Sequence, residues 1–390
     1  MSIDKSINDS LNRLDSLGQR RSLRVLPGVG GLIKDGNRQV INLSSNDYLD
    51  LANDPRVILG AQNAVTQFGC GATASRLMSG NLTIHDALEE RLAASVGQEA
   101  CLIFPSGFQT NLAVISSLMS DRDVIFSDEL NHASIIDGAR LAKAEVCVYR
   151  HNDTEHLREL LNRRSVSGRR LVVSDSVFSM DGDLADVVAL EKLAREFDAL
   201  LMIDEAHAVG VFGQGAGLCK ELGAQPDIVS GTMSKSLGTG GGFIALSEEL
   251  RDYLINVARP FIFSTGLSPA NVGAALAALD IIEAERGMGA ELLARGQMFH
   301  GMLREGGLDV PAYESQVIPL MVGSNETAVG LSAELLERDV LAVAVRPPSV
   351  PEGTARLRLS VTLAHSQDML EKAAGLIVER FGVLETSGRD

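Results

Sequence analysis

Residues 200–207 read Leu-Leu-Met-Ile-Asp-Glu-Ala-His, a short apolar run that ends in polar groups able to do chemistry. A continuous apolar run of this length is typical of a strand buried on both faces of a parallel sheet. Further along, Ile228-Val229 leads into Gly231-Thr232-Met233-Ser234-Lys235, and glycines follow at 238 and 240–242. Because ligands of α/β sheets sit beyond the carboxyl ends of the strands, the two segments predict one shared site.

Apolar runs of strand length alternate with helical patterns over much of the chain. The expected strands lie at 100–104, 123–126, 171–173 and 200–203. Helical periodicity is present at 84–96 and at 153–162, where Asp153 is the expected cap. Repeated βα units predict an α/β fold, with a mainly parallel central sheet flanked by helices on both faces.

The character of the sequence changes after Pro269. A helical stretch reaches Gly306, and candidate strands at 317–322, 341–345 and 355–362 predict a smaller α+β C-terminal domain. The N-terminus has a short amphipathic helical pattern followed by a cluster of arginines. We therefore expect an N-terminal arm over residues 1–45, a large catalytic domain over 46–285 and a small domain over 286–390.

The composition is that of an ordinary globular protein, with 45% hydrophobic and 22% charged residues. Acidic residues outnumber basic ones by 51 to 35, and the resulting charge of −16 disfavours nucleic acid and anionic membranes as partners. The polar N-terminus predicts no signal peptide. The four scattered cysteines suit a reducing cytoplasm, with Cys101 and Cys147 expected to be buried, and they show no metal-ligand spacing.

An aspartate at one strand end and a lysine in a nearby glycine-rich loop together meet the requirements of pyridoxal 5′-phosphate (PLP). Asp204 can pair with the pyridinium nitrogen, which keeps the ring an electron sink. Lys235, partly desolvated, can form an imine with the cofactor. Residues 106–108 follow an expected strand and open a helix, so their N–H groups can hold a phosphate. Either residue alone is more often a surface lysine or a helix cap; the combination indicates PLP.

Three other motif interpretations fail on spacing or context. Residues 204–207 also spell a helicase-type box, but the chain has no Gly-x-x-x-x-Gly-Lys-Ser/Thr loop to hold a nucleotide. The glycines at 213, 215 and 217 are too closely spaced and misplaced for a dinucleotide fingerprint. No Gly-x-Ser-x-Gly nucleophile motif surrounds Ser234.

From Arg20 to His365 the sequence resembles the α-oxoamine synthases, a family of fold-type I PLP-dependent transferases. The matching blocks lie at 42–49, 75–80 with His85, 106–108, 131–134, 177–183, 204–207, 231–242, 264–265 and 356–358. The likeness implies the same fold and cofactor along almost the whole chain. Asp175 departs from the family pattern, because glutamate is common at this position before Val-Phe-Ser-Met.

The resemblance also implies roles for individual residues. Lys235 would carry the cofactor as a Schiff base and move protons at Cα, Asp204 would pair with the ring nitrogen, His207 would bond the ring oxygen and His132 would stack on the ring. Further cofactor contacts are implied for Gly107, Phe108, Ser179, Thr232, Ser264 and Thr265. Of these, Ser264 and Thr265 would reach the phosphate of the neighbouring subunit, in a homodimer with shared active sites. Substrate contacts are implied for Arg20 (or the adjacent Arg21), Asn46, His132, Arg346, Ser349 and Arg358.

The stretch from Arg346 to Arg358, which opens Arg-Pro-Pro-Ser, is most similar to the biotin-pathway members of the family. This likeness implies a decarboxylative condensation of L-alanine with a pimeloyl thioester of coenzyme A or acyl-carrier protein. Another member, such as glycine C-acetyltransferase, remains an alternative that product identity would distinguish. A non-catalytic partner subunit is a second alternative, against which Lys235, Asp204, His207 and His132 together argue.

Overall fold

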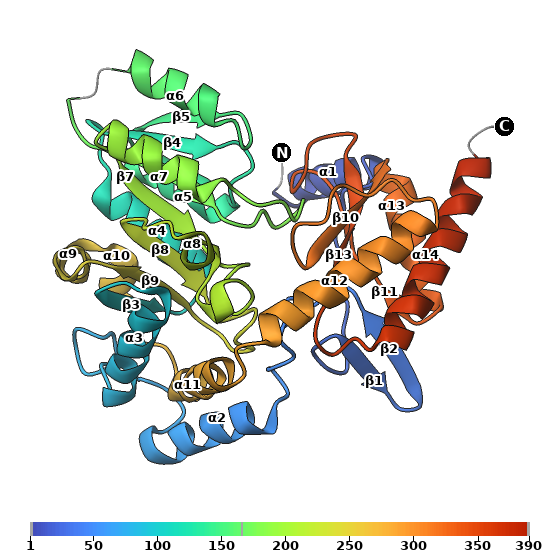
Figure 1. Cartoon of the computed structure of the whole chain (residues 1–390), viewed down its shortest axis with the longest axis horizontal. Helices are drawn as coiled ribbons and strands as arrows, with labels where there is room; N and C mark the ends of the chain where they lie inside the picture. Colours follow the sequence, from blue (N-terminus) through green and yellow to red (C-terminus); the bar gives the residue numbers. More distant parts are fainter. Residues whose placement is uncertain (1–2, 165–166, 388–390) are drawn as a thin grey trace. The chain divides into compact units, whose positions relative to one another are not determined.

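The computed structural model describes residues 3–164 and 167–387 and divides into two compact units (Figure 1). The larger unit comprises Leu49–Ser179 and Asp183–Glu291. The smaller unit comprises the chain up to Tyr48, the short segment Met180–Gly182 and the chain from Leu292 onward. The expected domain boundaries near residues 45 and 285 remain a prediction.

A seven-stranded sheet forms the centre of the larger unit, in the order β3-β9-β8-β7-β6-β4-β5. Neighbouring strands from β8 to β5 pair in parallel, whereas β9 runs antiparallel to both β3 and β8. The strands are β3 (Ala100–Phe104), β4 (Val124–Asp128), β5 (Glu145–Tyr149), β6 (Arg170–Asp175), β7 (Leu200–Asp204), β8 (Ile228–Thr232) and β9 (Gly242–Leu246). The expected α/β fold with a mainly parallel sheet is confirmed.

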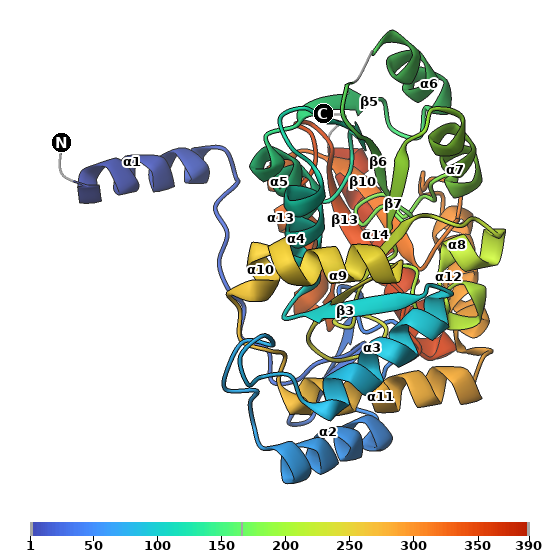
Figure 2. The same cartoon turned by 90° about the vertical axis from the view of Figure 1, so that its left-hand side faces the viewer.

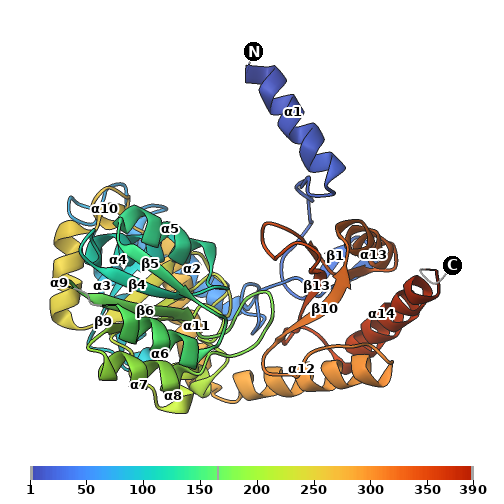
Figure 3. The same ribbon diagram turned by 90° about the horizontal axis from the view of Figure 1, so that it is seen from above.

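Helices cover both faces of this sheet (Figure 3). One face carries α4 (Gly107–Leu118), α5 (Ala133–Ala142), α9 (Glu248–Val257) and α10 (Arg259–Ile262). The other carries α6 (Thr154–Arg163), α7 (Val187–Glu196) and α8 (Leu218–Leu222). Strands such as β4 are buried at every residue, and their side chains form one apolar cluster with α4, α5 and α9. This rigid layer fixes the ends of the strands, where the site lies.

Two further helices of the larger unit, α2 (Pro55–Phe68) and α11 (Pro269–Ala284), run side by side (Figures 1 and 2). Glycine permits their close approach, because a Cβ added at Gly60 would lie 2.6 Å from the carbonyl oxygen of Gly273. Helix α3 (Thr83–Val96) packs against both α11 and the edge strand β3.

The smaller unit contains two three-stranded sheets. One has the order β1-β2-β11, with β1 (Leu32–Asp35), β2 (Arg38–Asn42) and β11 (Val340–Leu341); the other has the order β10-β13-β12, with β10 (Val317–Gly323), β13 (Ala355–Ser360) and β12 (Ala344–Val345). Its helices are α1 (Ile3–Ser16), α13 (Asn325–Glu337) and α14 (Gln367–Ser387), and α12 (Met288–Glu305) leads the chain in from the larger unit.

Most expected elements are confirmed, but two are wrong. The helical stretch 269–306 is two helices, α11 and α12, which are separated at residues 285–287. The expected strand 341–345 is two strands in different sheets, β11 and β12, because the chain passes from one small sheet to the other at residues 342–343. Burial of Cys101 and Cys147 is confirmed. Within the described ranges, no helix has both the length and the apolar character needed to span a bilayer.

Candidate active site

A pocket of about 280 Å³ opens at the carboxyl ends of β6, β7 and β8 in the larger unit. Its volume is just below the range of small-molecule pockets, roughly 300–1,000 Å³. The structure brings together eight of the residues expected from the sequence: Gly107, Phe108, His132, Ser179, Asp204, His207, Thr232 and Lys235. Ser106, from the expected phosphate-binding segment 106–108, also lines the pocket. Five more residues line it without a role assigned from the sequence: Asn111, Ser134, Asp175, Ala206 and Ser234.

Asp204, the last residue of β7, is buried and held by two donors. Its Oδ1 accepts the N–H of Ala206 at 2.9 Å, and its Oδ2 accepts Nδ2 of Asn111 at 2.7 Å. Asn111, on α4, also donates to the hydroxyl of Ser134 at 2.9 Å, while its own Oδ1 is buried without a partner. The carboxylate therefore has a fixed direction at the pocket wall.

His132 is the N-cap of α5, and its backbone N–H donates to Oδ2 of Asp175 at 2.7 Å. The Nδ1 atom accepts the backbone N–H of Ser134 at 3.3 Å and lies 2.7 Å from the Ser134 hydroxyl, so in the neutral ring Nε2 carries the proton. The protein around the ring partly removes it from water and lowers the pKa of His132, although the residue is open to the pocket. A neutral imidazole therefore faces the cavity at neutral pH.

Asp175 ends β6, directly opposite Asp204 in the parallel register. Burial raises the pKa of Asp175 well above its usual value, and the nearby charge of Asp204 raises it further. Asp175 thus holds a proton far more readily than an exposed carboxyl group does. Its position as the partner of the His132 backbone was not foreseen, since it depends on which strands are neighbours.

The start of α4 supplies an anion site beside Thr232. Ser106 caps the helix, and its hydroxyl accepts the N–H of Gln109 at 3.2 Å. A Cβ at Gly107 would lie 3.2 Å from the Cβ of Thr232, so glycine lets the helix start close to the end of β8. The hydroxyl of Thr232 lies 2.8 Å from that of Ser234. A helix N-terminus flanked by hydroxyls suits a phosphate.

Glu205 has a structural function, although in the sequence it stands between two residues that line the pocket, Asp204 and Ala206. Its fully buried carboxylate accepts the N–H groups of Leu218 and Cys219, both at 2.8 Å, and so caps the short helix α8. The helicase-like spelling of residues 204–207 therefore combines three residues that line the pocket, Asp204, Ala206 and His207, with one helix-capping residue, Glu205.

Ser264 and Thr265 do not line the pocket. The Ser264 hydroxyl accepts Nε2 of Gln109, in the first turn of α4, at 2.6 Å. Thr265 forms an isolated antiparallel bridge with Ser75. Their expected contact with the phosphate in a second copy of the chain remains a prediction.

The smaller unit brings together two of the expected substrate residues. Arg358 on β13 is buried and donates to Oδ1 of Asn46 at 3.0 Å, to the hydroxyl of Ser360 at 2.8 Å and to that of Tyr48 at 3.2 Å. Burial raises the pKa of Tyr48, with Arg358 opposing the change, so the phenol remains a neutral hydroxyl. The guanidinium is thereby oriented by the oxygens of Asn46, Ser360 and Tyr48.

The remaining expected substrate residues form a second cluster in the smaller unit. Arg346 donates to the carbonyl oxygens of Gly18 and Arg20, and burial lowers its pKa. The guanidinium of Arg20 is paired with Asp15 at 2.6 Å and is half-exposed. Ser349 is exposed, and its N–H donates to the carbonyl of Arg346 at 3.1 Å.

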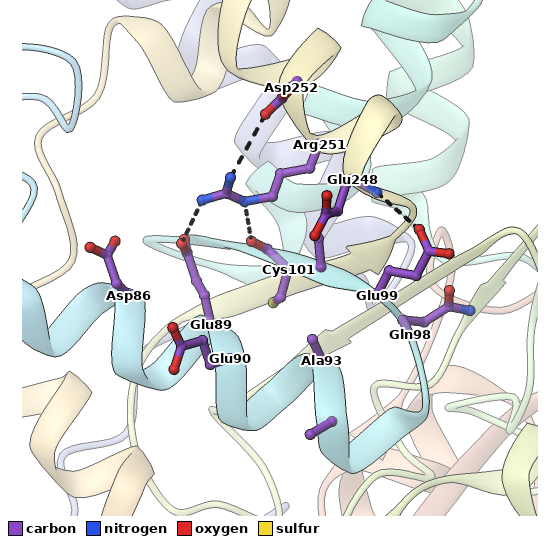
Figure 4. Close-up of a pocket in the computed structure, with 12 residues that line it drawn as sticks. Asp86, Glu89, Glu90, Ala93, Gln98, Glu99, Cys101, Glu248, Arg251 and Asp252 are labelled. Carbon is purple, nitrogen blue, oxygen red and sulfur yellow. Dashed lines mark hydrogen bonds and ion pairs between the residues drawn. The ribbon is translucent and has the colours of Figure 1, made fainter.

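A second pocket of the larger unit, of about 550 Å³, has the opposite character (Figure 4). It begins at the first residues of β3, away from the carboxyl ends of the parallel strands. Six carboxylates line it, from Asp86, Glu89, Glu90, Glu99, Glu248 and Asp252. Its arginine, Arg251, is engaged by Glu89 and by the carbonyl oxygen of Cys101 (Figure 4). Such a surface repels a phosphate, so this pocket does not suit a phosphate-bearing cofactor.

The residues of the Lys235 pocket fit PLP in every functional group. An amine, a fixed carboxylate, a neutral imidazole and a hydroxyl-flanked helix N-terminus stand around one cavity. Residues 38–377 match the family described as aminotransferase class I and II. The chain belongs to this family.

Individual proteins of known name are similar to this chain over nearly its whole length. The 8-amino-7-oxononanoate synthase of Geobacter metallireducens is 44% identical over 385 residues, covering 96% of this chain and 97% of the relative. That of Geotalea daltonii is 43% identical over 381 residues, with 96% and 97% covered.

Solved structures agree with the fold. An SPT structure with a PLP internal aldimine is 28% identical with a TM-score of 0.90, covering 96% of each chain. The 8-amino-7-oxononanoate synthase of Francisella tularensis is 25% identical with a TM-score of 0.77, covering 89% of this chain and 99% of the other. The expected fold-type I transferase architecture is confirmed, and the expectation of PLP as cofactor is supported.

Proposed function

We propose that this chain is an 8-amino-7-oxononanoate synthase. It joins L-alanine to a pimeloyl thioester, of coenzyme A or of acyl-carrier protein, with release of CO₂ and the free thiol, in biotin biosynthesis. The observation that carries the proposal is the convergence of Lys235, Asp204 and His207 with the α4 N-terminus around one pocket. The 44% identity to a relative of this name, over nearly the whole of both chains, supports the choice of reaction.

Cofactor binding divides among the elements of the pocket. The N–H groups at the start of α4, with Thr232, bind the phosphate through the helix dipole and a hydroxyl. Asp204 would keep the ring nitrogen protonated, and Asn111 orients the Asp204 carboxylate through a hydrogen bond of 2.7 Å. His132, whose lowered pKa favours the neutral imidazole, would stack on the cofactor ring.

When bound, PLP supplies an electron-accepting ring beside the Cα of the amino acid. The amine of Lys235 anchors the cofactor, removes the Cα proton of L-alanine and later returns a proton to the same carbon. Ser179 and His207 line the same pocket, where His207 would bond the ring oxygen and Ser179 would contact the cofactor. Condensation at the thioester carbonyl and loss of CO₂ then give 8-amino-7-oxononanoate.

Substrate recognition falls to the arginines of the smaller unit. Arg358, oriented by Asn46, binds the carboxylate of L-alanine through a charge-assisted pair. Arg20 binds the acyl substrate, and Arg346 and Ser349 assist Arg358 and Asn46 in binding the amino acid. The backbone hydrogen bonds of Arg20, Arg346 and Ser349 give this cluster a defined arrangement before substrate arrives.

Replacement of Arg358 by alanine should raise the KM for L-alanine by roughly 10- to 150-fold, equivalent to ~1.5–3 kcal/mol for a lost charged hydrogen bond. Steady-state kinetics with varied L-alanine measure this change. Arg358→Lys should fall between wild type and alanine, because lysine keeps the charge but loses the bidentate geometry. Arg304→Ala, an exposed arginine of α12, is the control. A KM unchanged in Arg358→Ala would remove the arginine from amino-acid binding.

The reaction itself is tested by product analysis. The enzyme receives pimeloyl-CoA and acetyl-CoA together with L-alanine, glycine and L-serine, and the products are identified by mass spectrometry. We expect 8-amino-7-oxononanoate to dominate. A glycine-derived or serine-derived product would favour another α-oxoamine synthase, such as a glycine C-acetyltransferase. No product and no PLP binding would favour a non-catalytic subunit.

We further expect a homodimer in which Ser264 and Thr265 contribute to the phosphate site of the second copy, and an enzyme that acts in the cytoplasm. The four free thiols support a reducing compartment. If Ser264→Ala and Lys235→Ala subunits are mixed, a shared site predicts that the heterodimer has one site with both changes and one with neither.

A further inference from the structure

His151, in the turn between β5 and α6, lies between two carboxylates of the larger unit. Its Nδ1 is 3.0 Å from Oδ1 of Asp128, and its Nε2 is 2.7 Å from Oδ2 of Asp183. A neutral imidazole has only one N–H, so one of these contacts would set a lone pair against a carboxylate oxygen. An imidazolium donates to both, and the geometry therefore favours the charged ring.

The surroundings of His151 stabilise this charge. Burial by itself lowers the pKa of His151, but the hydrogen bonds and charges of Asp128 and Asp183 more than offset burial and raise it to about 10. The carboxylate of Glu129 also lies close and accepts the backbone N–H of His151 at 2.9 Å. The ring stands edge-on to Phe178, with the ring centroids 4.4 Å apart.

One partner of His151 belongs to the rigid sheet. Asp128 is the last residue of β4, and its side chain also accepts the N–H groups of Leu130 and Asn152, both at 2.9 Å. These contacts fix the Asp128 carboxylate at the carboxyl end of a fully buried strand. His151 is thus anchored on the same edge of the sheet that carries the cofactor pocket.

The other partner belongs to a hairpin that reaches the pocket. The N–H of Phe178 donates to the carbonyl of Asp183 at 3.0 Å, and residues 177 and 184 form an antiparallel bridge. Phe178 is followed directly by Ser179, which lines the Lys235 pocket. Asn152 donates to the same Asp183 oxygen at 2.8 Å. The position of Ser179 is therefore set through a hairpin strand that His151 and Asn152 hold.

We propose that His151 is a positioning residue for the cofactor pocket: as a cation shared by Asp128 and Asp183, it fixes the hairpin that presents Ser179. The inference rests on the proposed function for the identity of the cofactor. His151 does not line the pocket and acts only through Phe178, Ser179 and Asp183.

The first test compares PLP binding to the apoprotein of wild type and His151→Gln, measured by absorbance titration. Glutamine donates to only one of the two carboxylates, so the other loses the hydrogen bond that the imidazolium supplies. We therefore expect the Kd for PLP to rise roughly 10-fold, as for one lost charged hydrogen bond. His156→Gln, in the adjacent helix α6, is the matched control, because the His156 ring accepts a backbone N–H and is not shared by two carboxylates among the described residues. An unchanged Kd in His151→Gln, or an equal rise in His156→Gln, would overturn the proposal.

A double-mutant cycle separates the positioning role of His151 from a general loss of stability. If His151 acts through Asp183, His151→Gln and Asp183→Asn should each weaken PLP binding, and the double variant should be no weaker than the worse single one. Effects on the Kd that simply multiply would show that the two residues act independently, contrary to the proposal.

The ionisation of His151 gives a readout that does not depend on PLP. The folded-state pKa lies above the ordinary value of 6.5, so the ion-pair contribution is complete below about pH 6.5 and is lost as the pH rises toward about 10. We expect imidazole NMR signals of His151 to show both nitrogens protonated at neutral pH, and wild-type PLP affinity to fall over this window more steeply than that of His151→Gln. A His151 pKa near 6.5 would overturn the proposed role of His151 but not the proposed function. A wild type that binds no PLP would overturn the proposed cofactor and, with it, this role.

Discussion

Replacement of Lys235 by alanine is expected to lower turnover by ~10⁴-fold or more, because one side chain both anchors the cofactor and moves the Cα proton. A general acid–base group alone contributes roughly 10²–10⁴-fold. The visible absorption of imine-bound PLP should disappear in the purified variant, while PLP still binds through the α4 N-terminus and Asp204. Absorbance spectra and single-turnover assays measure the two effects separately.

A matched lysine shows whether the effect belongs to the site. Lys192, exposed on α7, is suited to alanine because alanine favours helices. Lys192→Ala should keep both the spectrum and the rate. A Lys235→Ala variant that retained the visible band and full turnover would end the assignment of Lys235, whatever the product of the wild-type enzyme.

The cofactor pocket could be predicted from the sequence because its functional residues lie in short segments directly after predicted strands. Residues 204–207 and 231–235 each follow an apolar run, and parallel strands bring such ends to one edge. Residues 106–108 could be added, because a strand signal precedes them and a helical pattern follows. In each case the local period and the polar residue after it carry the information.

Asn111 shows what this reasoning misses. It lies inside α4, where its neighbours Ala113, Val114 and Ile115 are all buried, and nothing marks its amide as the partner of Asp204, 93 residues away. A polar residue within an apolar helix was the one available signal, since buried amides need partners. Asp175 was noticed only as a departure from a family pattern. Its contact with the His132 backbone depends on β6 lying between β4 and β7.

Two features of the smaller unit, the Arg358–Asn46 contact and the division of the expected strand 341–345, also depend on residues far apart in the sequence. The contact between Arg358 and Asn46 spans 312 residues of sequence, and only the family likeness assigned both to the substrate. The division of residues 341–345 between two sheets follows from their partners, β2 and β13, and a two-residue strand has too little length to show a period. Such short strands are specified by tertiary pairing rather than by their own pattern.

Replacement of Asp204 by asparagine is expected to leave PLP bound but to lower kcat by roughly 10²–10³-fold, the scale for loss of one preorganised electrostatic partner. Asparagine has nearly the same shape and can still accept the N–H of Ala206. Its NH₂ group would meet the NH₂ of Asn111, but a flip of Asn111 would supply the Oδ1 that is now without a partner. The fold therefore tolerates the Asp204→Asn change, and the fall in kcat measures the effect of the lost negative charge.

The Asn111→Ala variant separates the effect of the Asp204 charge from the effect of the orientation of the Asp204 carboxylate. It keeps the Asp204 carboxylate but removes one of the two donors that fix it, so kcat should fall by about 10-fold, the scale for a lost hydrogen bond to a charged group. Because Asn111 acts through Asp204, the double variant should be no slower than Asp204→Asn. Full activity in Asp204→Asn would mean that the ring nitrogen needs no anionic partner, and losses in kcat that multiply in the double variant would give Asn111 a separate role. Pre-steady-state kinetics of Cα proton exchange in L-alanine, measured with deuterated solvent, would distinguish these outcomes, because this step requires neither the thioester nor its acyl chain.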